Sequence, residues 1–228
     1  IHLRVHEMGG PALLFENVKG ANSYLYISDN GDISIIDTGM PGNAVKILSQ
    51  IYKMGTSMEK IKYLILTHSH IDHMGSVTDL KNVTGAKVAI HEKEVPYLLG
   101  EKKNKQKGII GLIFGILFKF VKNQNIVPDI ILKEGDFIGG LRVVSSPGHT
   151  EGSISLYNAE TVLFSGDAII TDKHSNIKGF NKIATFDISE AVKTINKIEH
   201  LEFEVLLPGH GKPVLKNASD KLKEYNKI

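Results

Sequence analysis

Three histidines and one aspartate stand close together in the first half of the chain. Segment 67–75 reads Thr-His-Ser-His-Ile-Asp-His-Met-Gly and directly follows the apolar run KYLIL. Imidazole and carboxylate groups bind zinc and related divalent metals. In an extended segment alternate side chains point the same way, so His68 and His70 can bind one metal ion together. Asp72 and His73 follow where the chain bends into the next helix, and they can serve a second ion.

Three further candidate ligands each come after a predicted strand and beside a glycine. His149 lies in SPGHT, Asp167 in SGD and His210 in PGHG. Glycine lets the backbone approach closely, and a rigid sheet holds the loops at its strand ends in place. Clustered imidazoles that served packing alone would each need a partner and would repel one another when protonated. Four such strand ends in one chain therefore indicate a metal centre.

The first half of the chain alternates short apolar runs with turn signals. An Asn-Gly pair between two alternating runs favours a hairpin, here at Asp29-Asn30-Gly31. Strands are predicted at Leu13–Val18, Tyr24–Ser28, Ile33–Asp37, Lys62–Thr67 and Lys87–Ile90. Helices are predicted at Asn43–Met54, with Asn43 as the N-cap, at Gly75–Asn82 and at Glu92–Leu99.

The second half of the chain shows a similar alternation of predicted strands and helices. Strands are predicted at Leu141–Ser145, Ser153–Tyr157, Val162–Ser165 and Glu204–Leu207. Helices are predicted near Ala218–Tyr225 and at Ile188–Ile198, where Asp187 and Glu190 have capping-box spacing. Two sheets packed face to face with helices outside would bury these strands on both sides. We therefore expect an α/β protein with a four-layer αββα sandwich.

Residues 101–127 interrupt this pattern as an apolar insertion. Lysines at 102, 103, 105 and 107 precede an almost wholly apolar run, Ile109–Phe118, that is too short for a membrane-spanning helix of about 20 residues. A segment this apolar does not stay exposed. Four hypotheses for this segment are a helix packed on its own domain, a lid over a site, a membrane-surface patch, and a homodimer contact through residues 108–121.

Composition excludes several classes of protein. The 228 residues are 42% hydrophobic and 23% charged, which is ordinary usage for a folded chain with a sizeable core. A formal net charge of +2 argues against a dedicated nucleic-acid binder. With no cysteine, neither a disulfide framework nor a thiolate metal ligand exists. The opening IHLRVHEMGG lacks the apolar core of a signal peptide, so a cytoplasmic protein is expected.

Taken together, the motifs resemble those of the metallo-β-lactamase-fold hydrolase superfamily. The resemblance rests on THSHIDH, PGHTEGS, SGD and PGHG, together with Ile36-Asp37-Thr38-Gly39, and it spans nearly the whole chain. It implies the αββα sandwich, with a single domain over residues 1–228 and a one- or two-metal site at the sheet edge. The PGHTEGS segment resembles that of the glyoxalase-II-like branch.

The resemblance also implies roles for individual residues. His68, His70 and His149 resemble the ligands of a first metal ion. Asp72, His73 and His210 resemble those of a second ion, with Asp167 bridging both. Asp37 resembles the family's acid that orients ligands without binding metal, a role whose loss commonly costs about 10–100-fold.

This ligand set suits two divalent ions, with zinc preferred and iron or manganese as alternatives. The expected reaction is attack by a metal-bridging hydroxide on an ester, thioester, lactone or similar bond of a small-molecule substrate. Asp72 is the expected catalytic residue, which steers the hydroxide and accepts its proton. The run after Asp167 lacks the tyrosine common in lactonases, no Arg-rich C-terminal segment of the glyoxalase II kind is present, and cysteine-ligand lactamases are excluded.

Three other functions remain open. A mononuclear-iron persulfide dioxygenase of the same fold would use His68, His149 and Asp167. A nuclease or phosphodiesterase is known in the superfamily, but the small net charge and the lack of a separate basic domain argue against it. A binding module without activity is disfavoured because every motif residue is present.

Overall fold

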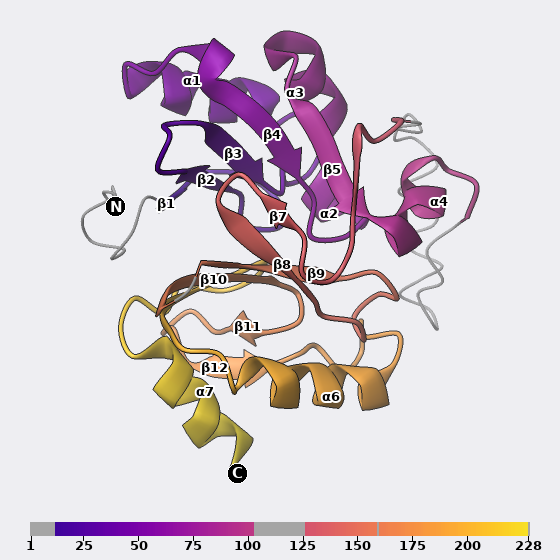
Figure 1. The fold of residues 1–228 in the computed structure, drawn as a ribbon, viewed down its shortest axis with the longest axis vertical. Helices are drawn as coiled ribbons and strands as arrows, with labels where there is room; N and C mark the ends of the chain where they lie inside the picture. Colours follow the sequence, from indigo (N-terminus) through magenta and orange to yellow (C-terminus); the bar gives the residue numbers. More distant parts are fainter. Residues whose placement is uncertain (1–11, 103–125, 159, 228) are drawn as a thin grey trace.

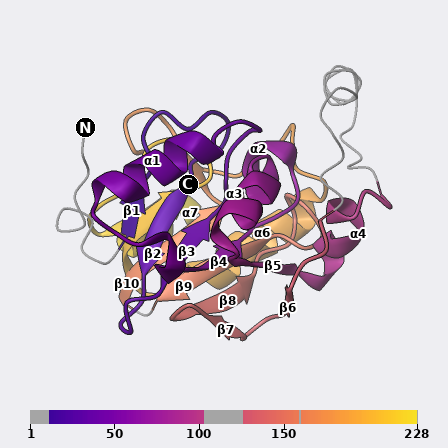
Figure 2. The same cartoon turned by 90° about the horizontal axis from the view of Figure 1, so that it is seen from above.

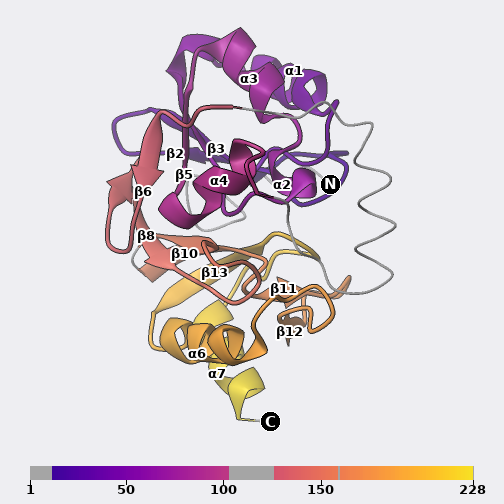
Figure 3. The same ribbon diagram turned by 90° about the vertical axis from the view of Figure 1, so that its right-hand side faces the viewer.

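The protein folds into four layers, in which two sheets are packed between two layers of helices (Figure 1). The computed structural model describes residues 12–102, 126–158 and 160–227. Helices α1 and α3 cover one sheet, and helices α6 and α7 cover the other (Figures 1 and 3). The predicted αββα sandwich is therefore confirmed.

In the described part of the chain the first sheet has six strands, which lie in the order in which they occur along the sequence. The first three pair antiparallel, and the third to the sixth run parallel to one another. These strands are β1 (Ala12–Leu14), β2 (Tyr24–Ile27), β3 (Ile33–Ile36), β4 (Ile61–Ile65), β5 (Lys87–His91) and β6 (Ile130–Leu132). The parallel arrangement brings the carboxyl ends of β3 and β4 to one edge.

The second sheet has five strands in the order β13-β10-β9-β8-β7. Strands β10 and β13 are parallel, and β9 runs antiparallel to both β8 and β10, so β8, β10 and β13 end on the same side. The bounds are β7 (Phe137–Ile138), β8 (Leu141–Ser145), β9 (Ile154–Asn158), β10 (Glu160–Gly166) and β13 (Phe203–Pro208). A separate two-stranded pair is formed by β11 (Ile170–Thr171) and β12 (Ile177–Gly179).

Helices fill the outer layers and the connections (Figure 2). They are α1 (Ala44–Lys53), α2 (Ile71–Met74), α3 (Val77–Thr84), α4 (Val95–Leu98), α6 (Ile188–Ile198) and α7 (Ala218–Asn226), with 3-10 turns η1 (Met58–Lys60) and η2 (Glu92–Glu94). The predicted cap of α6 is present, since the side chain of Asp187 accepts a hydrogen bond from the backbone N–H of Glu190. Among the described residues, no helix is long and apolar enough to cross a membrane.

Three apolar clusters hold the layers together. The central one joins the facing sides of the two sheets and contains Ile36 and Ile65 from the first sheet and Leu141 and Phe164 from the second. A second cluster packs α1 and α3 on the first sheet, and a third packs α6 and α7 on the second. Burial of both faces explains why these strands read as continuous apolar runs.

Two local predictions were confirmed in position but differ in detail. Asn43 is the N-cap of α1, as predicted, but its side chain makes no cap hydrogen bond because it binds the backbone of Lys19 and Met40 instead. The helix predicted around Gly75–Asn82 is present as α3, but it begins later, at Val77. The N–H groups of Gly75 and Ser76 bond to Gly39 O and Thr38 Oγ1, which separates α2 from α3.

The apolar insertion falls almost entirely on residues 103–125, which lie outside the described part of the chain. The predictions for that segment, namely a packed helix, a lid, a membrane-surface patch or a homodimer contact, therefore stay predictions.

Asp129 ties the start of β5 to helix α3. Its carboxylate lies 2.8 Å from the backbone nitrogen of Val88 and 2.6 Å from the Nζ of Lys81. Partial burial pushes the pKa of Asp129 upward, but these two hydrogen bonds outweigh burial and hold that pKa below its ordinary value.

An Asp129→Asn variant should therefore lose stability in a pH-dependent way. A carboxylate with a depressed folded-state pKa stabilises the fold above its unfolded-state pKa of about 3.9, and that contribution is lost as the pH falls through the folded-state pKa. Urea denaturation should show a lower free energy of unfolding for the variant at about pH 7, and the gap to wild type should shrink toward about pH 2. An unchanged gap at both pH values would contradict this assignment.

Candidate metal centre

Three imidazoles converge at the sheet edge where β4 and β8 end. His70 Nδ1 lies 3.0 Å from His68 Nε2 and 2.9 Å from His149 Nε2. His68 and His70 come from the segment after β4, and His149 follows β8 in the other sheet. Their ligand atoms all lie within 4.8 Å of one another, a spacing that suits a single metal ion. We call these three residues the tri-histidine cluster.

A second group adjoins it and is formed by Asp72, His73 and His210. Asp72 Oδ2 lies 3.3 Å from His210 Nε2 and 4.0 Å from His73 Nε2. Their ligand atoms also lie within 4.8 Å of one another. His73 is fully buried, whereas the side chains of Asp72 and His210 are 32% and 39% exposed, so solvent reaches the group from the side of these two residues. We call these three residues the aspartate–histidine cluster.

Asp167 lies between the two clusters. One carboxylate oxygen, Oδ1, is 3.2 Å from His73 Nε2. The other, Oδ2, is 3.4 Å from His149 Nε2 and 3.5 Å from His210 Nε2. The structure thus brings together all seven residues that the sequence predicted as ligands, from four strand ends in two sheets.

Asp37 holds His73, a member of the aspartate–histidine cluster, from the side opposite Asp167. Buried at the end of β3, its carboxylate accepts hydrogen bonds from the backbone N–H and hydroxyl of Thr67, each at 2.8 Å, and lies 2.8 Å from His73 Nδ1. In the neutral form of His73 this contact favours the ring hydrogen on Nδ1, which leaves the lone pair on Nε2 for a metal ion. Thr67, which also lies 3.1 Å from His68 Nδ1, was not singled out from the sequence.

The interior of the site fits a cation. His73 Nε2 and Asp167 Oδ1 are both buried, lie 3.2 Å apart and have no hydrogen-bond partner among the described residues. When the His73 ring is neutral, both atoms are acceptors and neither has a proton to give. Two buried acceptors that face each other are stabilised by a positive charge between them or beside them.

The pKa values reflect the same charges. Burial lowers the pKa of His73, but the carboxylates of Asp167 and Asp37 outweigh burial and raise it well above its ordinary value. For His149 burial dominates and lowers the pKa to about 4. For Asp72 burial raises the pKa, but hydrogen bonding to His210 and the charge of His73 lower it to about 2. The carboxylates that favour a protonated His73 would equally favour a bound metal cation.

Asn22 joins the two halves of the chain beside the aspartate–histidine cluster. Its backbone nitrogen donates to Gly209 O at 2.7 Å, and its side-chain amide donates to the carbonyls of Pro208 and Gly211 at 2.9 and 2.8 Å. The neighbouring Ala21 N–H donates to Asp72 O at 3.0 Å. Sequence reasoning missed this contact because nothing in the local pattern distinguishes Asn22 from a turn asparagine.

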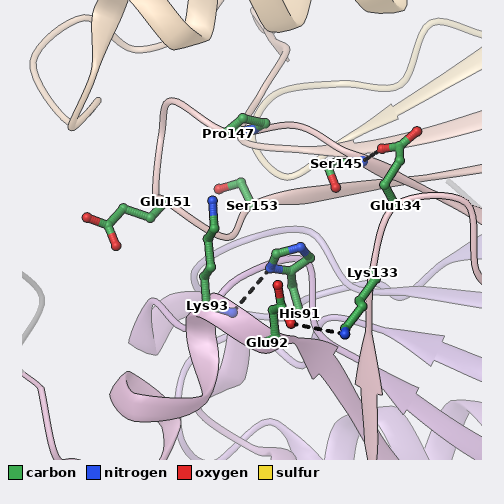
Figure 4. A pocket seen from close by; sticks show the side chains of 9 residues that line it. All are labelled: His91, Glu92, Lys93, Lys133, Glu134, Ser145, Pro147, Glu151 and Ser153. Atoms are coloured by element: carbon green, nitrogen blue, oxygen red, sulfur yellow. Dashed lines mark hydrogen bonds and ion pairs between the residues drawn. The ribbon is translucent and has the colours of Figure 1, made fainter.

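A pocket of about 280 Å³ lies beside the turn that carries His149, and none of the predicted site residues lines it (Figure 4). Two of its lining residues form an ion pair, since Lys133 Nζ lies 3.5 Å from Glu92 Oε2. His91 Nδ1 accepts a hydrogen bond from the backbone of Lys93. The residues that line it are His91, Glu92, Lys93, Lys133, Glu134, Ser145, Pro147, Glu151 and Ser153.

A Gly209→Ala variant should damage the centre directly. The added Cβ would lie 2.4 Å from Asp167 Oδ1 and 2.8 Å from His73 Cε1, so it would push these two side chains apart. We expect metal affinity to fall by about 10–100-fold, as for other changes that displace ligands. Gly55→Ala is the control, because its Cβ would meet nothing within 4 Å. Metal titration of both variants measures this, and equal affinities would contradict it.

The αββα sandwich with clustered histidine and aspartate ligands at its sheet edge defines a class of metallo-hydrolases. The family model described as the metallo-beta-lactamase superfamily matches residues 17–210, and the chain belongs to this superfamily. The expected superfamily is confirmed, and the family together with the histidine and aspartate clusters implies divalent metal.

Known relatives agree. The chain is 29% identical over 199 residues to the probable metallo-hydrolase YflN of Bacillus subtilis strain 168, covering 79% of this chain and 75% of YflN. It is 28% identical over 212 residues to the uncharacterized protein YobT of the same organism, covering 89% and 88%.

Solved structures show the same fold. The metallo-beta-lactamase family protein TTHA1429 from Thermus thermophilus superposes with a TM-score of 0.68 at 21% identity, over 95% of this chain and 78% of that one. TTHA1623 in a di-iron-bound form superposes with a TM-score of 0.67 at 24% identity, over 86% and 89%. At these identities the likeness concerns the fold alone.

Proposed function

We propose that the protein is a hydrolase with a two-metal centre that cleaves an ester, thioester, lactone or similar bond in a small molecule. His68, His70 and His149 would hold the first ion. Asp72, His73 and His210 would hold the second, and Asp167 would contact both. Zinc is the proposed metal because imidazole and carboxylate ligands suit it, and iron is the alternative to test because a structural neighbour is a di-iron form.

The observation that carries this proposal is the pair of buried acceptors, His73 Nε2 and Asp167 Oδ1, which lie 3.2 Å apart without a hydrogen-bond partner among the described residues. In the metal-free protein a protonated His73 can pair with Asp167 across this distance. A divalent cation would replace that proton, because it satisfies both buried acceptors when the ring is neutral. The adjoining imidazole nitrogens supply the remaining ligand atoms.

The residues of the centre have different proposed roles in hydrolysis. Divalent ions held there would lower the pKa of a water molecule to about 7 and polarise the bond under attack. Asp37 holds His73 in orientation through Nδ1. Asp72 Oδ2, on the more exposed side of the centre, is the proposed proton acceptor and orients the attacking water.

The motif around His149 supports one substrate class for the first tests. PGHTEGS resembles the glyoxalase-II-like branch, which supports thioesters and related acyl compounds as the first substrates to test. Two relatives bear the name beta-lactamase-like protein 2 homolog, from Caenorhabditis elegans and Drosophila melanogaster, at 26% and 29% identity. The relatives named as metallo-hydrolases favour hydrolysis over the dioxygenase alternative.

Removal of metal should abolish the activity reversibly. Purified protein would be assayed on a panel of thioesters, lactones, β-lactams and phosphodiesters, then dialysed against a chelator and reconstituted with Zn²⁺, Fe²⁺ or Mn²⁺. We expect hydrolysis of at least one acyl class, its loss in the chelated protein and its return with metal. Hydrolysis that survives complete metal removal would refute the proposal. Oxygen consumption with a persulfide by a one-iron protein would establish the dioxygenase instead.

A further inference from the structure

Glu94 is a fully buried glutamate that lies at the end of η2, outside the residues discussed so far. Glutamate is almost never fully buried without partners. No ion pair in the described ranges involves its carboxylate, so hydrogen bonds alone must compensate for the loss of water. The donors of these hydrogen bonds indicate the role of the Glu94 side chain.

The carboxylate bonds to two separate loops. Oε2 accepts from the backbone N–H of Ser69 at 2.9 Å and from the Ser69 hydroxyl at 2.5 Å. Oε1 accepts from the backbone N–H of Gly152 at 2.9 Å. The two loops are far apart in sequence and belong to different sheets. Each oxygen of one carboxylate therefore holds one loop.

Both anchored residues adjoin the tri-histidine cluster. Ser69 stands between His68 and His70, and both its backbone N–H and its hydroxyl are turned to Glu94. Gly152 belongs to the turn that begins at His149. The Glu94 carboxylate thus connects the backbone that carries two of the imidazoles with the backbone that carries the third.

The Gly152 loop has the space and the rigidity that its hydrogen bond with Glu94 requires. A Cβ at Gly152 would lie 2.8 Å from Glu94 Cγ and 2.9 Å from its Oε1, so a side chain at this position would displace the carboxylate. The turn is stiffened internally, since Thr150 N–H donates to Ser153 Oγ at 3.1 Å and the two hydroxyls lie 2.7 Å apart. A stiff turn transmits the position of Gly152 to His149.

We propose that Glu94 is a positioning residue that sets the spacing of the tri-histidine cluster by bridging the Ser69 and Gly152 loops. This inference rests on the proposed metal centre and adds to it a residue that binds neither metal nor substrate. Local sequence does not reveal it, because Glu92 and Glu94 occur in the same short charged run, Glu-Lys-Glu.

Two variants test the bridge by different changes. Glu94→Gln keeps the length of the side chain but turns one acceptor into a donor, which leaves either Ser69 or Gly152 without its acceptor. Glu94→Asp keeps the charge but is one methylene too short to reach both loops. Glu92→Gln is the matched control, because it removes the same charge from the same turn at a side chain that is 48% exposed and pairs with Lys133.

The measurement is Zn²⁺ affinity of the apo-protein by competition with a chromophoric chelator, with Co²⁺ absorption as a report on ligand geometry. We expect both Glu94 variants to bind about tenfold more weakly, at the lower end of the effect of residues that orient ligands, with altered Co²⁺ spectra. The Glu92→Gln control should bind like wild type. If the Glu94 variants do not fold, Ser69→Ala removes one bond of the bridge and should weaken binding by about threefold.

The outcomes separate this inference from the proposed function. Wild-type protein that takes up no metal would refute the metal centre itself. Wild-type protein that binds metal, with Glu94 variants of equal affinity and unchanged spectra, would refute the bridge alone. A thermal melt of each apo-variant distinguishes lost stability from lost positioning, and a lower melting temperature with unchanged metal affinity would also refute the bridge.

Discussion

Replacement of Asp167 by asparagine is expected to lower metal content and to reduce turnover by at least about 100-fold, beyond the usual effect of residues that only orient ligands. Asp167 lies within 3.5 Å of imidazole nitrogens from three separate loops, those of His73, His149 and His210. The amide would keep the shape of the side chain but remove its charge. One of its oxygens would also become an NH₂ group in a space arranged for acceptors.

Elemental analysis and the hydrolysis assay measure this effect side by side. Asp220→Asn is the matched control, because that side chain is 71% exposed on α7 and lies outside the two clusters. The control should retain wild-type metal content and activity. Full metal content together with full turnover in the Asp167→Asn variant would show that this carboxylate does not belong to the centre.

Replacement of Gly211 by alanine is expected to destabilise the fold by about 3 kcal/mol or more. Gly211 has a φ of +93°, which disfavours any side chain, and an added Cβ would lie 2.0 Å from the backbone oxygen of Thr171. That oxygen belongs to β11, whose Thr171 N–H donates to the carbonyl of His210. Relief of the clash would therefore displace the backbone that carries a proposed ligand.

Gly85→Ala separates backbone strain from the clash. Gly85 also has a positive φ, of 68°, but a Cβ there would meet nothing within 4 Å. Its replacement should cost about 1 kcal/mol, the strain alone. Urea denaturation compares the two variants. Equal free energies of unfolding would mean that the close contact with Thr171 is not what requires glycine at position 211.

The sequence predicted the main elements because both faces of each sheet are buried. Strands such as Tyr24–Ile27 and Leu141–Ser145 read as apolar runs, and α6 carries its cap in adjacent residues. Strands of two or three residues, such as Phe137–Ile138 and Ile170–Thr171, were missed because they are too short to show any periodicity. Only tertiary pairing defines them.

The site likewise contains residues that local sequence identifies and residues that only tertiary packing identifies. His68, His70 and the other ligand candidates could be identified because each lies at a strand end, where parallel strands bring loops to one edge. Thr67, Asn22 and Glu94 could not, since their partners are distant in sequence and appear only when the sheets are packed. The Glu94 carboxylate, for example, accepts a hydrogen bond from Gly152, 58 residues away.

Metal content of the purified protein, measured by elemental analysis alongside the protein concentration, tests the central claim most directly. We expect two divalent ions per chain, held jointly by imidazoles and carboxylates from both sheets. We also expect both ions to be lost when His68 and His70 are replaced together by alanine. A wild-type chain that binds no divalent ion after exposure to Zn²⁺, Fe²⁺ and Mn²⁺ would contradict it.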